Sequence, residues 1–321
     1  MKVLKNREAL LGLAILVTMG VIALRFPAFI RPGNLANVFN DTAPLMILAV
    51  GQMMVILTKC IDLSVAANLA LTGMVAALMN GAGVPLPMVL LTVLAMGAAL
   101  GAVNGLLIWK VGIPSIVVTL GTMTIFRGVI FLMTAGKWVN AHEMTDGFKA
   151  LPRTILLGLP VMSWVAVGVI LIFAVVLGRT ALGRSFFAVG GNPHAAVYAG
   201  IDVGRTQFMA FVFSGMLAGL TGYLWVARYA VAYVDIAGGF ELDVVAACVI
   251  GGIAIAGGAG SIWGAILGAL FLGVIKNALP VVGISPFWQM AISGSAIILA
   301  VVFNAAQSRP KGRIILREAN Q

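Results

Sequence analysis

Two groups of residues have the composition of a reactive site, but neither has the spacing that such a site needs. Gly258-Ala259-Gly260 resembles the start of a phosphate-binding loop, yet no lysine follows it and no strand pattern precedes it. Cys60 and Cys248 lack metal-ligand spacing, so they are expected to be structural thiols. The sequence therefore predicts no catalytic residue, no metal site and no cofactor.

The rest of the chain is dominated by residues that avoid water. Hydrophobic residues make up 61% of the 321 residues and charged residues 9%, against about a quarter charged in soluble domains. Apolar runs of about 20 residues, the length that crosses a bilayer, recur along nearly the whole sequence. The sequence thus predicts an all-α, polytopic membrane protein with one transmembrane domain over residues 1–321. The net charge of +10 falls at span ends, which argues against a nucleic-acid partner.

Ten transmembrane helices are expected between charged residues and Pro or Gly punctuation. The third and ninth are short and rich in glycine, so either could be broken or re-entrant. The expected ranges are 9–24, 43–58, 63–79, 88–109, 113–134, 160–178, 206–227, 243–258, 260–276 and 287–303.

The distribution of basic residues predicts the orientation of these spans. With a cytoplasmic N-terminus, twelve Lys or Arg residues fall on cytoplasmic segments and seven outside, as the positive-inside rule requires. Both termini, including the basic tail 304–321, are then cytoplasmic. Lys2, Lys5 and Arg7 precede the first apolar run as in a secretory signal, but no small-residue cleavage site follows, so we expect a retained helix.

Polar residues inside the expected spans are mostly uncharged. Asp62, Glu241, Asp243 and Lys276 lie near span ends, where access to water is easier. Because ion-driven transporters usually carry ionisable groups within their spans, this pattern favours a neutral, hydroxyl-rich solute and an external energy source. Any single polar residue could instead hydrogen-bond between helices or to its own helix. The residues expected to line a translocation pathway are Gln52, Asn68, Asn104, Thr119, Thr122, Arg127 and Gln289.

Arg127 is the charged residue placed deepest within an expected span. A charge at the bilayer centre costs roughly 3 kcal/mol or more, unless it faces a polar cavity or a partner. The alternative is that its side chain reaches toward the outer surface.

Glycines predict where helices pack closely, because small residues let helix backbones approach each other in lipid. The two sets that share a helix face are Gly97, Gly101 and Gly105, and Gly260, Gly264 and Gly268.

The cytoplasmic loop 179–205 contains the signature of a short helix. Asn192 can cap a helix with Pro193 at its first position, and Gly200 can end it. Such a helix would present apolar and basic side chains to a soluble partner, or it could lie on the membrane surface. The residues expected to couple to a partner are Arg184, Asn192, Pro193, His194, Val197 and Tyr198.

Four stretches, in order along the chain, resemble the permeases of bacterial carbohydrate importers of the ATP-binding-cassette type, the ribose, xylose, galactose and rhamnose group. The stretch 203–243 is most similar to the rhamnose permeases. The first of the four departs from the family pattern, which usually has glycines where Lys59 and Cys60 stand. The four stretches are 58–66, 114–128, 183–200 and 246–277.

The resemblance implies an importer in the bacterial inner membrane, in which two identical or related permease subunits form the pathway. It implies a cytoplasmic ATPase that binds the loop around 192–200 and hydrolyses the ATP, so this subunit is not itself an enzyme. It also implies a periplasmic binding protein that delivers a monosaccharide such as rhamnose. Two other functions stay open, an ion-coupled secondary transporter and an ATP-driven permease for nucleosides or branched-chain amino acids.

Overall fold

A computed structural model of the chain describes residues 7–283, 288, 291, 294 and 295, and it shows an all-α membrane protein, as expected. The tenth expected helix (287–303), the basic tail 304–321 and Gln289 lie largely or wholly outside the described residues. Each of the other nine expected ranges overlaps a helix. These helices are α1 (Arg7–Arg25), α2 (Pro32–Leu57), α3 (Val65–Gly81), α4 (Leu86–Leu106), α5 (Ser115–Thr134), α7 (Val161–Arg179), α10 (Val203–Tyr229), α11 (Phe240–Ile250) and α12 (Ile262–Val281).

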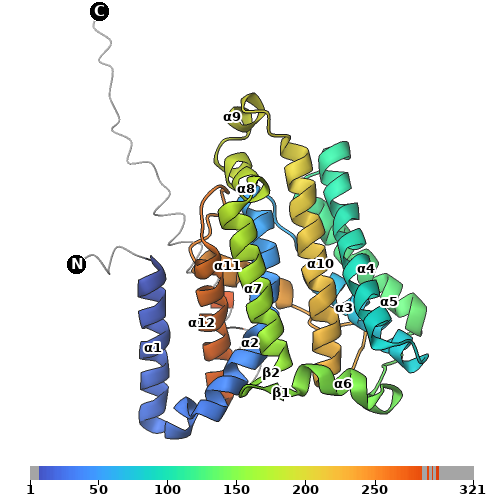
Figure 1. Cartoon of the computed structure of the whole chain (residues 1–321), viewed down its shortest axis with the longest axis vertical. Helices are drawn as coiled ribbons and strands as arrows, with labels where there is room; N and C mark the ends of the chain where they lie inside the picture. Colours follow the sequence, from blue (N-terminus) through green and yellow to red (C-terminus); the bar gives the residue numbers. More distant parts are fainter. Residues whose placement is uncertain (1–6, 284–287, 289–290, 292–293, 296–321) are drawn as a thin grey trace, which may run out of the picture.

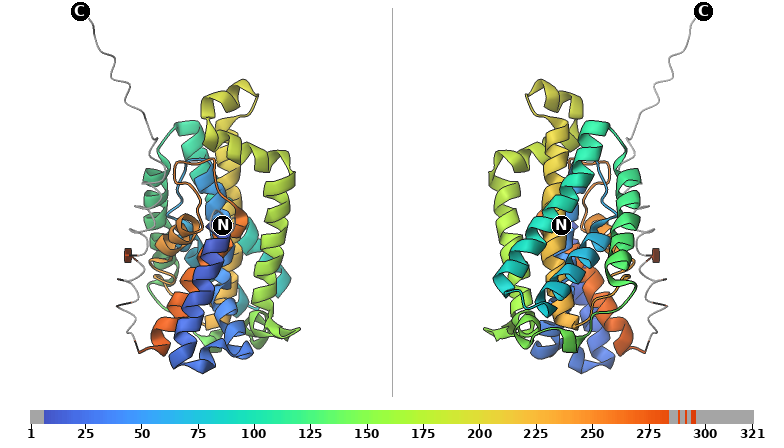
Figure 2. Two further views of the ribbon diagram at one scale, coloured as in Figure 1. Left: turned by 90° about the vertical axis from the view of Figure 1, so that its left-hand side faces the viewer. Right: turned by 90° about the vertical axis from the view of Figure 1, so that its right-hand side faces the viewer.

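Short elements join the long helices at the two ends of the bundle. The elements are η2 (Pro27–Ile30), the π-helical turn η3 (Leu107–Val111), η4 (Ala141–Glu143), α6 (Asp146–Arg153), β1 (Ile155–Leu156), β2 (Leu159–Pro160), α8 (Ala181–Gly191) and α9 (Pro193–Tyr198). Figure 1 shows α6 and the β1–β2 hairpin at one end, which we call the α6 end. The opposite end carries α8 and α9 and is called the α9 end, and α9 projects from it in both side views (Figure 2).

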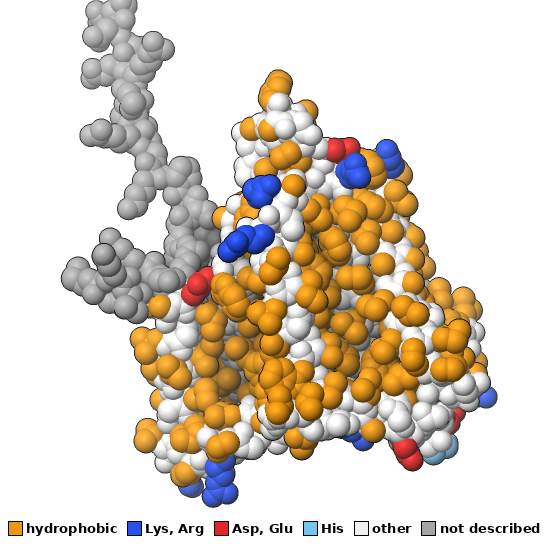
Figure 3. All heavy atoms as spheres, in the orientation of Figure 1, with side chains coloured by type: hydrophobic (Ala, Val, Ile, Leu, Met, Phe, Trp, Pro, Cys, Tyr) orange, Lys and Arg blue, Asp and Glu red, His pale blue; other side chains and the backbone are white. Residues whose placement is uncertain are grey.

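The surface between the two ends is apolar. Seven of the described helices are long and apolar enough to cross a membrane. Hydrophobic side chains cover the middle of the face in Figure 3, whereas Lys and Arg side chains gather toward its two ends. This distribution matches a hydrocarbon-facing belt between two aqueous boundaries.

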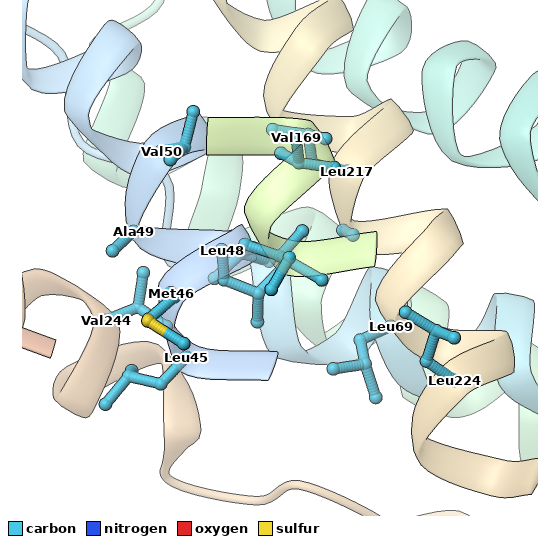
Figure 4. Packing of buried hydrophobic residues seen from close by; sticks show 14 of the residues in the cluster. Leu45, Met46, Leu48, Ala49, Val50, Leu69, Val169, Leu217, Leu224 and Val244 are labelled. Atoms are coloured by element: carbon cyan, nitrogen blue, oxygen red, sulfur yellow. The ribbon is translucent and has the colours of Figure 1, made fainter. Parts of the chain in front are cut away.

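Helix α2 forms the centre of the bundle. The side chains from Thr42 to Leu57 are all buried, because α7, α10, α11 and α12 surround this helix. Figure 4 shows Leu45, Met46 and Leu48 of α2 in one cluster with Val169 of α7 and Val244 of α11. Enclosure by protein also gives the polar side chains of α2, among them Asn40, Thr42 and Gln52, an environment that lipid could not offer.

Two helices, α2 and α11, differ markedly from the ranges expected from the sequence. Helix α2 begins at Pro32 rather than near residue 43 and continues through Pro44; neighbouring helices make such a proline tolerable within a membrane. Helices α3 and α12, the third and ninth expected spans, are continuous over 17 and 20 residues, so neither is broken. The short element is α11, which has 11 residues and is about 16 Å long, roughly half the bilayer core.

The chain crosses the remaining depth after α11 as a non-helical segment, 251–261. Gly252, Gly257 and Gly258 of this segment have positive φ angles, a conformation that strains other residues. Its Gly258 N–H donates to the Leu57 carbonyl at 3.0 Å. Irregular backbone is tolerated at this depth where protein surrounds it.

Candidate translocation and coupling sites

The polar residues expected at a pathway are buried inside this single chain. Gln52 on α2, Asn68 on α3 and Asn104 on α4 are each at most 3% exposed. Thr119 and Thr122 on α5 are also buried, and their hydroxyls donate to carbonyls one turn back at 2.9 and 3.1 Å. These side chains face other helices of the same chain in this conformation, so a role at a pathway stays a prediction.

Two of these residues meet around Asp62, in the non-helical turn between α2 and α3. The Ser64 hydroxyl donates to the Asp62 carboxylate at 2.6 Å, and the Ser64 N–H donates to the same oxygen at 2.9 Å. The Ser214 hydroxyl of α10 donates to the other carboxylate oxygen at 3.2 Å. Asn104 donates to the Ser64 hydroxyl at 2.8 Å, which ties α4 to the turn. With its amide oriented to satisfy both groups, Gln52 pairs with the backbone N–H and carbonyl of Asp62.

The expectation that Asp62 lies near water is therefore wrong. Its side chain is buried, with the residue 2% exposed, and the described residues offer it hydroxyl and amide donors but no cation. Because an unpaired carboxylate is costly to bury, this turn depends on all of its donors. The spacing Asp62-x-Ser64 could have indicated the local hydrogen bonds of this turn. The contributions of Ser214 and Asn104 could not be recognised, because these residues are distant in sequence.

Two ion pairs join helices of the bundle toward the α6 end. Asp243, also expected near water, is 8% exposed and forms an ion pair with Lys276. Arg228 of α10 pairs with Asp41 of α2. The first pair joins the consecutive helices α11 and α12, and the second joins helices distant in sequence. Both reduce the cost of burying their charges.

Arg127 binds the chain that follows α10. Its guanidinium donates to the Val234 carbonyl at 2.6 Å and to the Ile236 carbonyl at 3.2 Å, and lies 3.1 Å from the Asp235 carboxylate. Its side chain is 19% exposed. The arginine therefore fixes the 230–239 segment against α5.

The exposed face of α5 is unusual for a lipid-facing helix. Gly121, Thr124 and Gly128 are exposed at helical spacing, and among the residues that the structure describes a Cβ atom at either glycine would meet no atom within 4 Å. The Thr124 hydroxyl donates to the Leu120 carbonyl at 3.2 Å. Sequence alone does not show that these residues share an exposed face, because their exposure depends on how α5 is rotated.

The expected short helix at the α9 end is confirmed. Helix α9 begins at Pro193, and the Asn192 side chain caps it by accepting from the Ala195 N–H at 3.1 Å. Gly200 has a φ of 78° just after the helix. The stretch before it, expected as loop, forms α8, which is capped by the Thr180 hydroxyl.

Helix α9 presents its side chains outward. Tyr198 is 93% exposed and Val197 is 60% exposed, and His194 and Arg184 are also exposed, whereas Pro193 is half-buried. A cleft of about 460 Å³ lies beside it, between α8 and the start of α10.

Helix α8 contacts the core through Gly190. A Cβ atom at this position would overlap both the Leu57 carbonyl oxygen and the Gly258 nitrogen. The end of α2, the 251–261 segment and α8 therefore meet at one point. A displacement of α8 would change the contacts at this point.

The glycine sets lie at helix contacts, with one exception. Backbone atoms of α10 lie against Gly97, Gly101 and Gly105, and backbone atoms at or near the end of α11 lie against Gly264 and Gly268 of α12. Gly260 is the exception, because α12 begins only at Ile262. Its expected place on the same helix face is wrong, and it lies in the 251–261 segment with a φ of 151°.

A bundle of membrane-spanning helices with an exposed, capped helix at one end defines a polytopic helical membrane protein. Comparison with known families gives the class: residues 34–301 match the family described as branched-chain amino acid transport system / permease component. The match covers most of the sequence, and the chain belongs to this permease family.

The chain is similar to individual relatives along most of their length. The ribose import permease protein RbsC of Escherichia coli (strain K12) is 39% identical over 292 residues, which cover 90% of this chain and 91% of the relative. The autoinducer 2 import system permease protein LsrC of Enterobacter sp. (strain 638) is 37% identical over 301 residues, covering 94% and 87%. LsrC of Salmonella typhi is 35% identical over 299 residues, covering 93% and 86%. No solved structure matches the chain.

The comparisons confirm the expected resemblance to importer permeases. The family description and the names of the relatives refer to different solutes, so membership alone does not select one. The narrower resemblance to rhamnose permeases stays a prediction.

Proposed function

We propose that this chain is the permease subunit of an ATP-driven importer that moves a monosaccharide across the bacterial inner membrane. The observation that carries the proposal is the family membership together with the exposed α9 helix, which offers a partner protein a rigid contact. The relatives named for ribose and autoinducer 2 import support a small polar solute. Rhamnose is the specific monosaccharide that the sequence resemblance favours.

In this proposal the α9 end faces the cytoplasm and binds an ATPase subunit. Val197 and Tyr198 supply apolar contact area, while Arg184 and Arg205, both exposed, flank it with positive charge. The two termini are cytoplasmic, and a binding protein delivers sugar at the α6 end.

The pathway would lie between two permease subunits, which are identical or related. The exposed α5 face with Gly121, Thr124 and Gly128 supports this arrangement, since small and polar side chains there would contact solute or a second helix better than lipid. ATP binding would draw the two ATPase subunits together and displace α8 and α9. The contact of Gly190 with Leu57 and Gly258 would carry that displacement into the core.

A charge substitution on α9 tests the docking surface. Tyr198→Asp places a carboxylate in the centre of the proposed apolar contact, so the co-purified ATPase should be lost, whereas Tyr198→Phe should retain it. The measurement is the ATPase-to-permease ratio after affinity purification from detergent-solubilised membranes. A stoichiometric complex with Tyr198→Asp would contradict the assignment.

One observation favours a second function, an ion-coupled transporter: Asp62 is a buried carboxylate without a cation among the residues that the structure describes. Uptake of radiolabelled rhamnose and ribose should be compared in cells that carry or lack the chain. Depletion of ATP with arsenate should abolish chain-dependent uptake, and a protonophore should leave it largely intact while ATP is maintained. The opposite pattern would replace the ATP-driven importer with the ion-coupled one.

A further inference from the structure

The β1–β2 hairpin exposes three consecutive large aliphatic side chains. Ile155, Leu156 and Leu157 are 72%, 54% and 85% exposed. The hairpin pairs Ile155 with Pro160 and Leu156 with Leu159, and Leu157 forms its tip with a φ of 49°. Side chains of this kind are costly to leave in water, so a surface of matching character should cover them.

The position of the hairpin along the membrane normal follows from α7. No charged residue stands between Arg153 and Arg179, so the hairpin and α7 form one uncharged stretch. Helix α7 runs from Val161 to Arg179 and is about 28 Å long, close to the roughly 30 Å thickness of the hydrocarbon core. With the exposed Arg179 at one boundary, the hairpin lies at the other.

The surroundings of the hairpin fit the boundary between lipid headgroups and acyl chains. Trp164, in the first turn of α7, is 37% exposed, and its indole N–H donates to the Leu156 carbonyl at 2.8 Å. An indole with one apolar and one hydrogen-bonding side is typical of this boundary. Leu171 and Ile172, further along α7, are 54% and 60% exposed, so the apolar surface continues from the hairpin region into the membrane-spanning belt.

We propose that the β1–β2 hairpin is an interfacial anchor, whose Ile155, Leu156 and Leu157 side chains insert into the lipid leaflet at the α6 end. The turn and the strand edges of the hairpin contain backbone N–H and C=O groups that need hydrogen bonds from water or headgroups. The hairpin therefore lies at the boundary and not in the hydrocarbon centre. The anchor would fix the depth of α7, whose other end leads directly into α8. The inference depends on α7 spanning the membrane and not on the identity of the solute or on the orientation of the chain.

Site-specific fluorescence in lipid nanodiscs tests the anchor. Cys60 and Cys248 are buried, so Leu157→Cys supplies an accessible thiol for an environment-sensitive fluorophore. Two matched positions calibrate the depth: His142→Cys in the exposed η4 turn at the same end, and Leu171→Cys within α7. Quenching is measured with aqueous iodide and with phospholipids that carry a nitroxide either just below the headgroup or near the acyl-chain end.

The label at Leu157 should show blue-shifted emission and its strongest quenching by the shallow nitroxide. The label at His142 should be quenched by iodide, and the label at Leu171 by the deep nitroxide. Iodide quenching at Leu157 equal to that at His142 would show a water-exposed hairpin and overturn the proposal. Protection of Leu157 from both iodide and nitroxide lipids would also overturn it, because the chain itself or a second copy of it would then cover the hairpin.

Discussion

The contact between α4 and α10 predicts a measurable cost for adding a single methyl group at Gly97. A Cβ atom there would lie 2.8 Å from the Gly219 Cα and 2.9 Å from the Gly219 nitrogen, and nearer still to the Gly215 carbonyl oxygen. Carbon atoms in contact prefer a separation of about 3.5–4.0 Å. All three neighbours are backbone atoms, which cannot rotate away as a side-chain end would. Gly97→Ala must therefore separate the two helices by roughly 1 Å.

The separation would affect more than one residue. Gly101 and Gly105 lie on the same α4 face, and Asn68 donates to the Gly97 carbonyl at 3.2 Å. Overpacking of a close contact typically costs about 1–3 kcal/mol, and we expect Gly97→Ala to lower the free energy of unfolding by that amount. Gly168→Ala on α7 is the matched control, because its Cβ would meet no described atom of the chain within 4 Å.

The assay is reversible unfolding of the purified protein in mixed micelles, followed by loss of helical circular dichroism as the denaturing detergent increases. Gly97→Ala should unfold at a lower detergent fraction than the native protein, and Gly168→Ala should unfold at the native fraction or slightly above it, since alanine favours helix. Equal midpoints for the two variants would refute the close-packing argument.

Three further perturbations test other contacts. Gly264→Leu should abolish uptake while leaving membrane insertion intact, because its side chain would overlap the Gly251 carbonyl oxygen; unchanged uptake would contradict this. Asp62→Asn should reduce the free energy of unfolding by about 1–3 kcal/mol, since it leaves a donor of the turn unsatisfied. An unchanged free energy of unfolding would contradict the role given to the hydrogen bonds around Asp62. Arg127→Gln should raise amide hydrogen exchange over 233–239, because that segment loses its charged partner; unaltered exchange would show that the segment is held by other contacts.

The positions of the spans could be predicted because a bilayer imposes a length and a polarity on every helix that crosses it. The cap at Asn192 and the helix start at Pro193 could also be predicted, since both depend on local backbone chemistry. The early start of α2 could not, because Asp41 and Pro44 normally interrupt an apolar helix. Asp41 is tolerated in α2 because it forms an ion pair with Arg228 of α10, which lies far along the chain.

The buried turn around Asp62 shows the same limit at the candidate site. The burial of this turn depends on hydrogen bonds from Ser214 and Asn104, which form only when α4 and α10 pack beside it. The short length of α11 was missed for a related reason: the apolar run continues past Gly251, while the helix does not. Sequence pattern therefore located the helices, whereas tertiary contacts decided which polar groups became buried.

The 251–261 segment has a consequence for how this bundle can change shape. A membrane-spanning helix resists bending because each turn must break backbone hydrogen bonds where no water can replace them. Half of the depth beside α12 is instead crossed by glycine-rich chain anchored at Leu57. The φ and ψ angles of this segment can change without breaking helical hydrogen bonds, so a change of shape there costs less free energy than bending one of the neighbouring helices.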